Sequence, residues 1–208
     1  MTHLVTAILA LAVAASAPIA NAQSPSTGDG GRTVGEERAI SLCSTCHGPR
    51  GVAPSAEFPN LAAQRPEYIA AQLRNFQSRT REEKPAHDMM WGIAGNLDAT
   101  TIESIAAYYA AQPPAPGQPG DPTQIASGKK LFETGVADRG VPPCASCHGE
   151  NAQGEADFPR LAGQHAKYVR RQLEYIQGLV RQAPVMHGIV KELTPAEIEA
   201  LAAYVQSL

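Results

Sequence analysis

The chain has 208 residues, with 17 Lys and Arg against 20 Asp and Glu and a formal net charge of -3. Neither half is basic enough to suggest nucleic-acid binding. Aromatic residues make up only 5% of the chain, so two small domains built from it would have thin apolar cores. Small domains of that kind usually need a disulfide, a metal or a prosthetic group.

The N-terminus carries an export signal. Residues 4–17 are an uninterrupted apolar run, followed by the small-x-small sequence Ala20-Asn21-Ala22. This order predicts a secretory signal peptide over residues 1–22, with cleavage after Ala22. A permanent anchor is the alternative, but a spanning helix needs about 20 apolar residues. No other stretch is apolar enough to cross a bilayer, so we expect a soluble mature protein.

The rest of the sequence contains an internal repeat of two copies. The sequence C-x-x-C-H-G occurs at residues 43–48 and 144–149, and the segments 58–73 and 158–173 agree at 8 of 16 positions. A Pro- and Gly-rich stretch, QPPAPGQPGDP, separates the copies; proline stiffens such a segment and removes helix hydrogen bonds. We therefore expect two tandem domains, residues 23–112 and 123–208, joined by a linker over residues 113–122.

Each copy has the signals of helices. Thr33 and Glu36 form a capping-box pattern ahead of the first motif, and Pro66 suits the first turn of a helix that runs to about residue 79. Ile102, Ile105, Ala106 and Tyr109 give a helical stripe, which Ile198, Leu201, Ala202 and Val205 repeat. Before this second stripe, Thr194 and Glu197 give another capping-box pattern, with Pro195 in the first turn. No convincing alternating strand pattern is present. The predicted fold class is all-α.

All four cysteines lie in the two motifs, as Cys43, Cys46, Cys144 and Cys147. Two disulfides are one interpretation, since exported proteins oxidise their thiols, but disulfides do not require a histidine after each pair. Zinc sites usually combine cysteine pairs that lie closer in sequence than these. Thioredoxin-type pairs usually sit in a βαβ setting, and no strands are expected here.

Covalent haem attachment accounts for every residue of the motif. The two thiols form thioethers with the haem vinyl groups, and helical geometry puts the following histidine beside them. His47 and His148 are therefore candidate proximal iron ligands. Two covalently bound haem c groups would also supply the apolar centre that each thin core lacks, so we expect the haem-free chain to be largely unfolded.

Methionine is the candidate for the second axial ligand. Met90 and Met186 occupy matching places in the repeat, each seven residues before a leucine that precedes the last helix. Core packing is the commoner role of methionine, but only three methionines remain after residue 22, and two of them match in the repeat. Met89 is the adjacent competitor for the first haem.

The remaining polar residues give weaker signals. His87 and His187 flank the methionines and would be substitute ligands if methionine failed, whereas His165 aligns with Arg65 and is not repeated. All three are interpreted as ordinary polar residues. Lys167, Arg170 and Arg171 form a basic cluster, either a solvated helix face or a docking patch for an acidic partner.

Together these residues resemble the dihaem cytochromes c of the c4 type. The resemblance rests on the doubled C-x-x-C-H-G, on FPNLAAQ and FPRLAGQ, and on a methionine before each last helix. It implies two tandem cytochrome c-like helical domains, each wrapped around one haem, with the axial pairs His47–Met90 and His148–Met186. It also implies a periplasmic carrier that passes single electrons from a donor such as a quinol–cytochrome c reductase to a terminal oxidase or reductase.

The main interpretation is thus an electron-transfer protein that turns over no substrate and meets the membrane only through partners. One alternative is the dihaem subunit of a periplasmic dehydrogenase, and another is a dihaem peroxidase, which needs an iron that is open. Because Trp91 follows Met90 whereas His187 follows Met186, we expect the two haems to differ in reduction potential.

Overall fold

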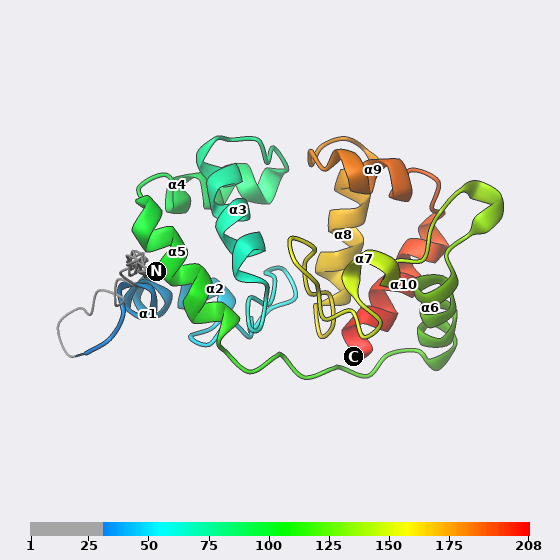
Figure 1. Ribbon diagram of the computed structural model, residues 1–208, viewed down its shortest axis with the longest axis horizontal. Coiled ribbons are helices and arrows are strands. Elements are labelled where there is room, and N and C mark those ends of the chain that lie inside the picture. The colour runs from blue at the N-terminus through cyan, green and yellow to red at the C-terminus, as the bar shows by residue number, and fades with distance from the viewer. Residues whose placement is uncertain (1–30) are drawn as a thin grey trace, which may run out of the picture.

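A computed structural model describes residues 31–208 as two helical halves joined by an extended segment (Figure 1). The predicted signal peptide, residues 1–22, lies outside the described residues. Within residues 31–208 there is no named strand, only three isolated bridges. The all-α prediction is therefore confirmed. No helix in this range is both long and apolar enough to span a membrane.

The N-terminal half, residues 31–112, starts with a nearly continuous helical run. This run consists of α1 (Val34–Arg38), the π-helical turn η1 (Ala39–Cys43) and α2 (Ser44–His47). After a loop come α3 (Pro66–Gln77), the π-helical turn η2 (Ala86–Met90), α4 (Trp91–Ala94) and α5 (Ala99–Ala110). The run thus ends on a candidate ligand, His47, and η2 ends on another, Met90.

The C-terminal half, residues 122–208, repeats this order. It contains α6 (Pro122–Thr134), the 3-10 turn η3 (Ala137–Arg139), α7 (Ala145–His148), α8 (Ala166–Gln177), α9 (Pro184–Val190) and α10 (Pro195–Ser207). The sequence analysis did not identify α6. Its signal was present, because Asp121 caps the helix and Pro122 occupies its first turn.

Side-chain caps fix where several helices begin. Thr33 accepts a hydrogen bond from the Glu36 N–H, so the predicted cap of α1 is present. Asp98 does the same for α5. Thr194 and Glu197 form a complete capping box at α10, as predicted. Each cap satisfies backbone donors that the first helical turn leaves free.

The first and last helices of each half cross in close contact, and glycine makes the contact possible. A Cβ on Gly35 in α1 would lie 2.1 Å from the Ser104 carbonyl oxygen in α5, and a Cβ on Gly128 in α6 would lie 2.0 Å from that of Ala200 in α10. Any larger residue would push the two helices apart. This crossing places the helix that precedes each motif against the last helix of the same half.

Each half has its own apolar core, and the two cores are filled differently. Phe132 in α6 is buried in the C-terminal half, where it packs on Tyr204. The matching position in the N-terminal half is Ala39, and the aromatic ring there comes instead from Tyr109 in α5. The largest buried ring thus lies on the first helix of the C-terminal half and on the last helix of the N-terminal half.

The extended segment between α5 and α6 is docked on the C-terminal half along its course (Figure 1). Ala115 is buried against Gly163, and a Cβ at Gly163, whose φ is +74°, would lie 2.5 Å from the Ala115 carbonyl oxygen. The Gln118 N–H donates to the Gln206 carbonyl over 2.9 Å. The segment is therefore held at two points.

The two halves meet through a reciprocal set of amide hydrogen bonds. Gln164 accepts from the Asn60 N–H over 2.8 Å and donates to the Asn60 carbonyl over 3.0 Å. Gln64 does the same with Arg160, at 2.7 and 2.9 Å. Because Gln64 and Gln164 are repeat-related, the contact has an approximate two-fold character.

Candidate metal centres

Each half ends a short helix on a buried histidine. His47 closes α2 with 8% of its surface exposed, and His148 closes α7 with 5% exposed. The next residues, Gly48 and Gly149, have positive φ angles of 74° and 81° and turn the chain away. The local sequence thus fixes each ring at the end of its motif helix.

One ring nitrogen of each histidine is held by a backbone carbonyl. Nδ1 lies 2.9 Å from the Pro59 oxygen in His47 and 2.9 Å from the Pro159 oxygen in His148. A carbonyl can only accept, so Nδ1 donates and Nε2 is left with its lone pair. Burial lowers the pKa of both imidazoles below the ordinary value. Each ring is thus neutral and able to bind a metal through Nε2.

The Nε2 atom of His148 is buried without a hydrogen-bond partner. Buried polar atoms are normally satisfied, and an exception calls for an explanation. The atom lines a cavity, so a metal at that point would use the free lone pair.

The four cysteines lie beside these histidines as free thiols, each partly buried. Burial raises the pKa of Cys43 and raises that of Cys144 to about 11. Cys43 and Cys144 are therefore neutral thiols that line a mostly apolar cavity. Within residues 31–208 no group of three or more His, Cys, Asp or Glu side chains is arranged to hold a metal ion.

A mostly apolar cavity of about 480 Å³ connects the two motifs. Its lining includes the cysteines and the histidine of both motifs together with Met90 and Met186. A large flat apolar group with a metal at its centre fits this lining, because thiols, an imidazole nitrogen and a thioether sulfur are presented from each half. The residues present therefore fit a haem in each half.

The structure separates the two candidate methionines of the N-terminal half. Met90 is partly buried and packs on the core of its half, as Met186 does in the other. Met89 is 39% exposed, although it also lines the cavity. This placement favours Met90 over Met89.

The three other histidines within residues 31–208 have polar partners of their own. His87 Nδ1 lies 2.9 Å from an Asp88 carboxylate oxygen, and His187 Nδ1 lies 3.0 Å from the Ile176 carbonyl. His165 is buried between the halves with Nε2 3.3 Å from the Ala53 carbonyl. These contacts agree with the interpretation of all three as ordinary polar residues.

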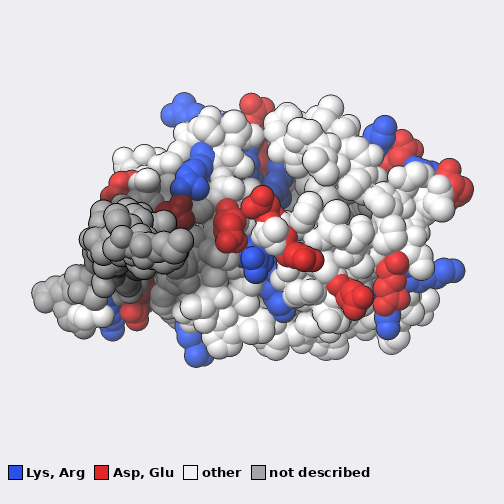
Figure 2. Space-filling model, viewed as in Figure 1, with Lys and Arg blue, Asp and Glu red and all other residues white. Residues whose placement is uncertain are grey.

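The basic cluster of α8 contacts the other half of the same chain. Lys167 and Arg171 both pair with Glu57, while Arg170 pairs with Glu174 and Glu199 of its own half. Neither interpretation made from sequence, a solvated face or a docking patch, anticipated this bridge. On the face shown in Figure 2, Lys and Arg lie intermixed with Asp and Glu rather than in one large patch.

One set of cavity-lining residues was missed by the sequence analysis. Arg81 and Arg181 form an antiparallel bridge between the halves, and Gln72, Gln172 and Tyr68 hydrogen-bond to them. The signal was available, since Arg81 and Arg181 are separated by the same 100 residues as Phe58 and Phe158. We call these five residues the central cluster.

Two C-x-x-C-H helices, each with a buried neutral histidine and each sharing one mostly apolar cavity with a methionine of its own half, define a c-type cytochrome with two haem sites. The comparisons agree. A family model described as cytochrome c matches residues 125–208. Cytochrome c4 from Thiocapsa roseopersicina is 38% identical over 193 residues, which cover 90% of this chain and 96% of that protein.

Two further similarities extend this result. A thiosulfate dehydrogenase electron acceptor from Thiomonas intermedia is 34% identical over 168 residues, covering 77% of this chain and 75% of that protein. The solved structure of cytochrome c4 from Acidithiobacillus ferrooxidans aligns with a TM-score of 0.76 and 36% identity, covering 80% of this chain and 98% of the other. The chain belongs to the cytochrome c4 family, and its cofactors are two covalently bound haem c groups.

Proposed function

We propose that this protein is a periplasmic electron carrier that passes single electrons between respiratory donors and a terminal oxidase or reductase, without turning over a substrate. The observation that carries the proposal is the duplicated ligand set: each half presents two thiols, one histidine and one methionine to a common cavity. A haem iron with both axial positions filled exchanges electrons and has no open position for a substrate.

The proposal includes a ligand for each haem position, supported by the side chains that line the cavity. Cys43 and Cys46 hold the first haem through thioethers, and Cys144 and Cys147 hold the second. His47 and Met90 are the axial ligands of the first iron. His148 and Met186 are the axial ligands of the second.

The protein's own residues fix the coordination. A bound haem iron cycles between the ferrous and ferric states and so takes up and releases one electron at a time. The Pro59 and Pro159 carbonyls hold the histidine tautomer and increase the electron density on Nε2. The apolar lining limits the access of water, which keeps the reorganisation of charge small when an electron enters or leaves.

The domain boundaries belong to the same proposal. We assign residues 23–112 and 123–208 to the two cytochrome c domains and residues 113–122 to the linker. In the structure α5 ends at Ala110 and α6 begins at Pro122. The export signal over residues 1–22, cleaved after Ala22, supports delivery to the periplasm, where c-type haem would be attached.

A second candidate function has its own observation. The similarity to a protein named as a thiosulfate dehydrogenase electron acceptor favours a partner chain that oxidises a small inorganic sulfur compound. Under this alternative, the protein accepts electrons from a periplasmic dehydrogenase, either as its subunit or as its diffusing acceptor. Copurification of a dehydrogenase chain with the protein would favour this candidate over a respiratory shuttle.

The experiment that tests the main proposal is a redox titration of the mature holoprotein, followed by visible absorption, with haem counted per chain. We expect two haems, two one-electron steps, a methionine-to-iron charge-transfer band in the oxidised form and no spectral change when carbon monoxide is added to the reduced form. A haem that binds carbon monoxide rapidly would contradict a pure carrier and favour a peroxidase-type enzyme.

A further inference from the structure

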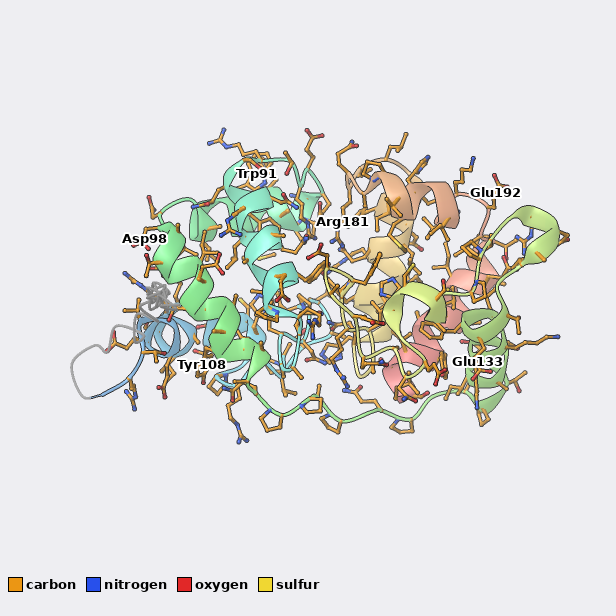
Figure 3. The ribbon with its side chains drawn as sticks, viewed as in Figure 1. Trp91, Asp98, Tyr108, Glu133, Arg181 and Glu192 are labelled. Carbon is orange, nitrogen blue, oxygen red and sulfur yellow. The ribbon has the colours of Figure 1, made fainter. Side chains whose placement is uncertain are left out.

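The central cluster occupies the space between the two haem sites. Figure 3 shows Arg181 between the two halves. Arg181 donates to Tyr68 of the other half over 2.8 Å and to Gln172 over 2.5 Å. Arg81 donates in turn to Gln172 of the opposite half over 3.1 Å. Both guanidinium groups are buried and line the cavity, so their charges act on both metal centres with little screening by water.

The repeat is broken at one position of this otherwise symmetric arrangement. Two residues after Arg81 the chain has Glu83, whereas two residues after Arg181 it has Ala183. Glu83 is 1% exposed, and its Oε1 accepts hydrogen bonds from Arg81, one of them from Nε over 2.8 Å. Its other carboxylate oxygen, Oε2, is buried without a partner, and the residue lines the cavity.

The charge balance therefore differs between the two halves. Arg81 is neutralised by its own carboxylate, which is fixed within the same segment. Arg181 has no carboxylate at the matching place; it faces the hydroxyls of Tyr68 and Tyr168 and the more distant charge of Glu83. The carboxylate thus belongs to the N-terminal half, and Arg181 of the C-terminal half lacks a carboxylate of its own at the matching place.

Glu83 is tied to the ligand segment of the first haem. Its backbone carbonyl accepts from the N–H groups of Ala86 and His87, over 2.8 and 3.1 Å, at the start of the turn that ends in Met90. The neighbouring Arg81 carbonyl accepts from the Trp91 indole N–H over 2.8 Å. The carboxylate is therefore carried by the segment that leads directly into the turn ending at Met90.

We propose that Glu83 is a positioning residue whose fixed negative charge lowers the reduction potential of the first haem relative to the second. This inference rests on the proposed function, in which each half holds one redox-active haem. A negative charge in a dry site stabilises the ferric state over the ferrous state. An electron that enters the protein then rests preferentially on the second haem, so the internal transfer has a direction.

The test is Glu83→Gln in the holoprotein, with both potentials measured by spectroelectrochemical titration and each step assigned to its haem by the NMR shifts of the haem methyl groups. We expect the first potential to rise more than the second. The equilibrium constant for electron transfer from the first haem to the second should fall by about three- to tenfold.

Two variants make the test specific. Glu82→Gln removes an exposed carboxylate one residue away and should leave the equilibrium constant unchanged. Ala183→Glu places a carboxylate at the repeat-related position and should lower the second potential.

Equal shifts of both potentials in Glu83→Gln, or no shift, would overturn the inference while leaving two haems and a working carrier. A chain that carries fewer than two haems would overturn the proposed function and this inference with it.

Discussion

Single residues explain how a repeated sequence yields two similar but unequal sites. The motif spacing alone predicts the four cysteines and both histidines as haem-binding residues, because their chemistry depends on neighbours within one helical turn. It was not sufficient to choose between Met89 and Met90, because that choice depends on which side chain packs on the core. The structure favours Met90 through its burial.

The methionine assignment predicts different results for two adjacent substitutions. Met90→Ala should remove an axial ligand, so that one haem per chain binds carbon monoxide in the reduced state. Met89→Leu should leave both haems unreactive, since its side chain is the more exposed of the two. Carbon monoxide difference spectra measure both. Reactivity in Met89→Leu would show that the ligand had been assigned to the wrong residue.

The buried side chain of Tyr109 leads to a second prediction about a single residue. Its ring is fully buried, and its hydroxyl lies beside the Cys43 thiol without a hydrogen bond of ordinary geometry. Removing an unpaired buried hydroxyl while keeping the ring should not destabilise the protein. We therefore expect the Tm of Tyr109→Phe to be unchanged or higher.

The matched control for that variant is Tyr109→Ala, which deletes the ring itself. It should cost about 3–5 kcal/mol, as other large-to-small aromatic changes in a core do. Thermal unfolding of the two holoproteins gives the comparison. A clear loss of stability in Tyr109→Phe would mean that the hydroxyl has a partner in the haem-loaded protein.

The starts of some helices can be predicted from the sequence, whereas the start of α6 resembles the linker before it. The caps at Thr33 and Thr194 were predicted because a side-chain oxygen and its backbone donor lie three residues apart. Helix α6 was missed because its first residue, Pro122, is also the last proline of the linker. One proline thus serves both as the end of an extended segment and as the first turn of a helix.

The Glu197 carboxylate in the capping box of α10 makes the folding stability depend on pH. Hydrogen bonds from Arg139 and then from Thr194 lower the pKa of Glu197 to about 2. The folded state therefore binds this proton more weakly than the unfolded chain does. The stabilisation is complete above pH 4.5, the ordinary value, and is lost as the pH falls towards 2.

Replacing Glu197 with Gln removes the charge that pairs with Arg139 and should reduce stability at pH 7 by about 1 kcal/mol, the upper end for a partly exposed ion pair. The difference between Glu197→Gln and the unchanged protein should shrink as the pH falls from 4.5 to 2. Denaturant titrations at several pH values measure it. Glu199→Gln, a nearby exposed carboxylate paired with Arg170, is the control and should have little effect at any pH. A constant difference across that range would contradict the linkage.

The whole molecule depends on an interface that the sequence hardly revealed. The repeat predicted two units, because similarity between segments is visible in one dimension. It did not predict how they face each other, because Gln64 and Gln164 look like any other polar residues until their amides are seen to pair with Arg160 and Asn60.

The hydrogen bonds of this interface should couple the unfolding of the two halves, so we expect their removal to uncouple it. Gln164→Ala leaves a buried backbone N–H and a buried carbonyl of Asn60 without their partners, each at a cost of about 1–3 kcal/mol. We expect differential scanning calorimetry to show one transition for the unchanged holoprotein and two for Gln64→Ala/Gln164→Ala. Lys167→Ala removes only an exposed ion pair and should keep a single transition. A single transition in the double variant would contradict this role of the interface.

The segment between α5 and α6 bears on how strong that interface has to be. The segment is anchored to the C-terminal half at Ala115 and Gln118. Only the short stretch between the end of α5 and Ala115 therefore separates the N-terminal half from this anchor. The effective concentration of the N-terminal half at the contact is then in the millimolar range typical of short linkers. A polar interface too weak to join two separate proteins is therefore sufficient here, and the exchange of electrons between the haems becomes a first-order process whose rate does not change when the protein is diluted.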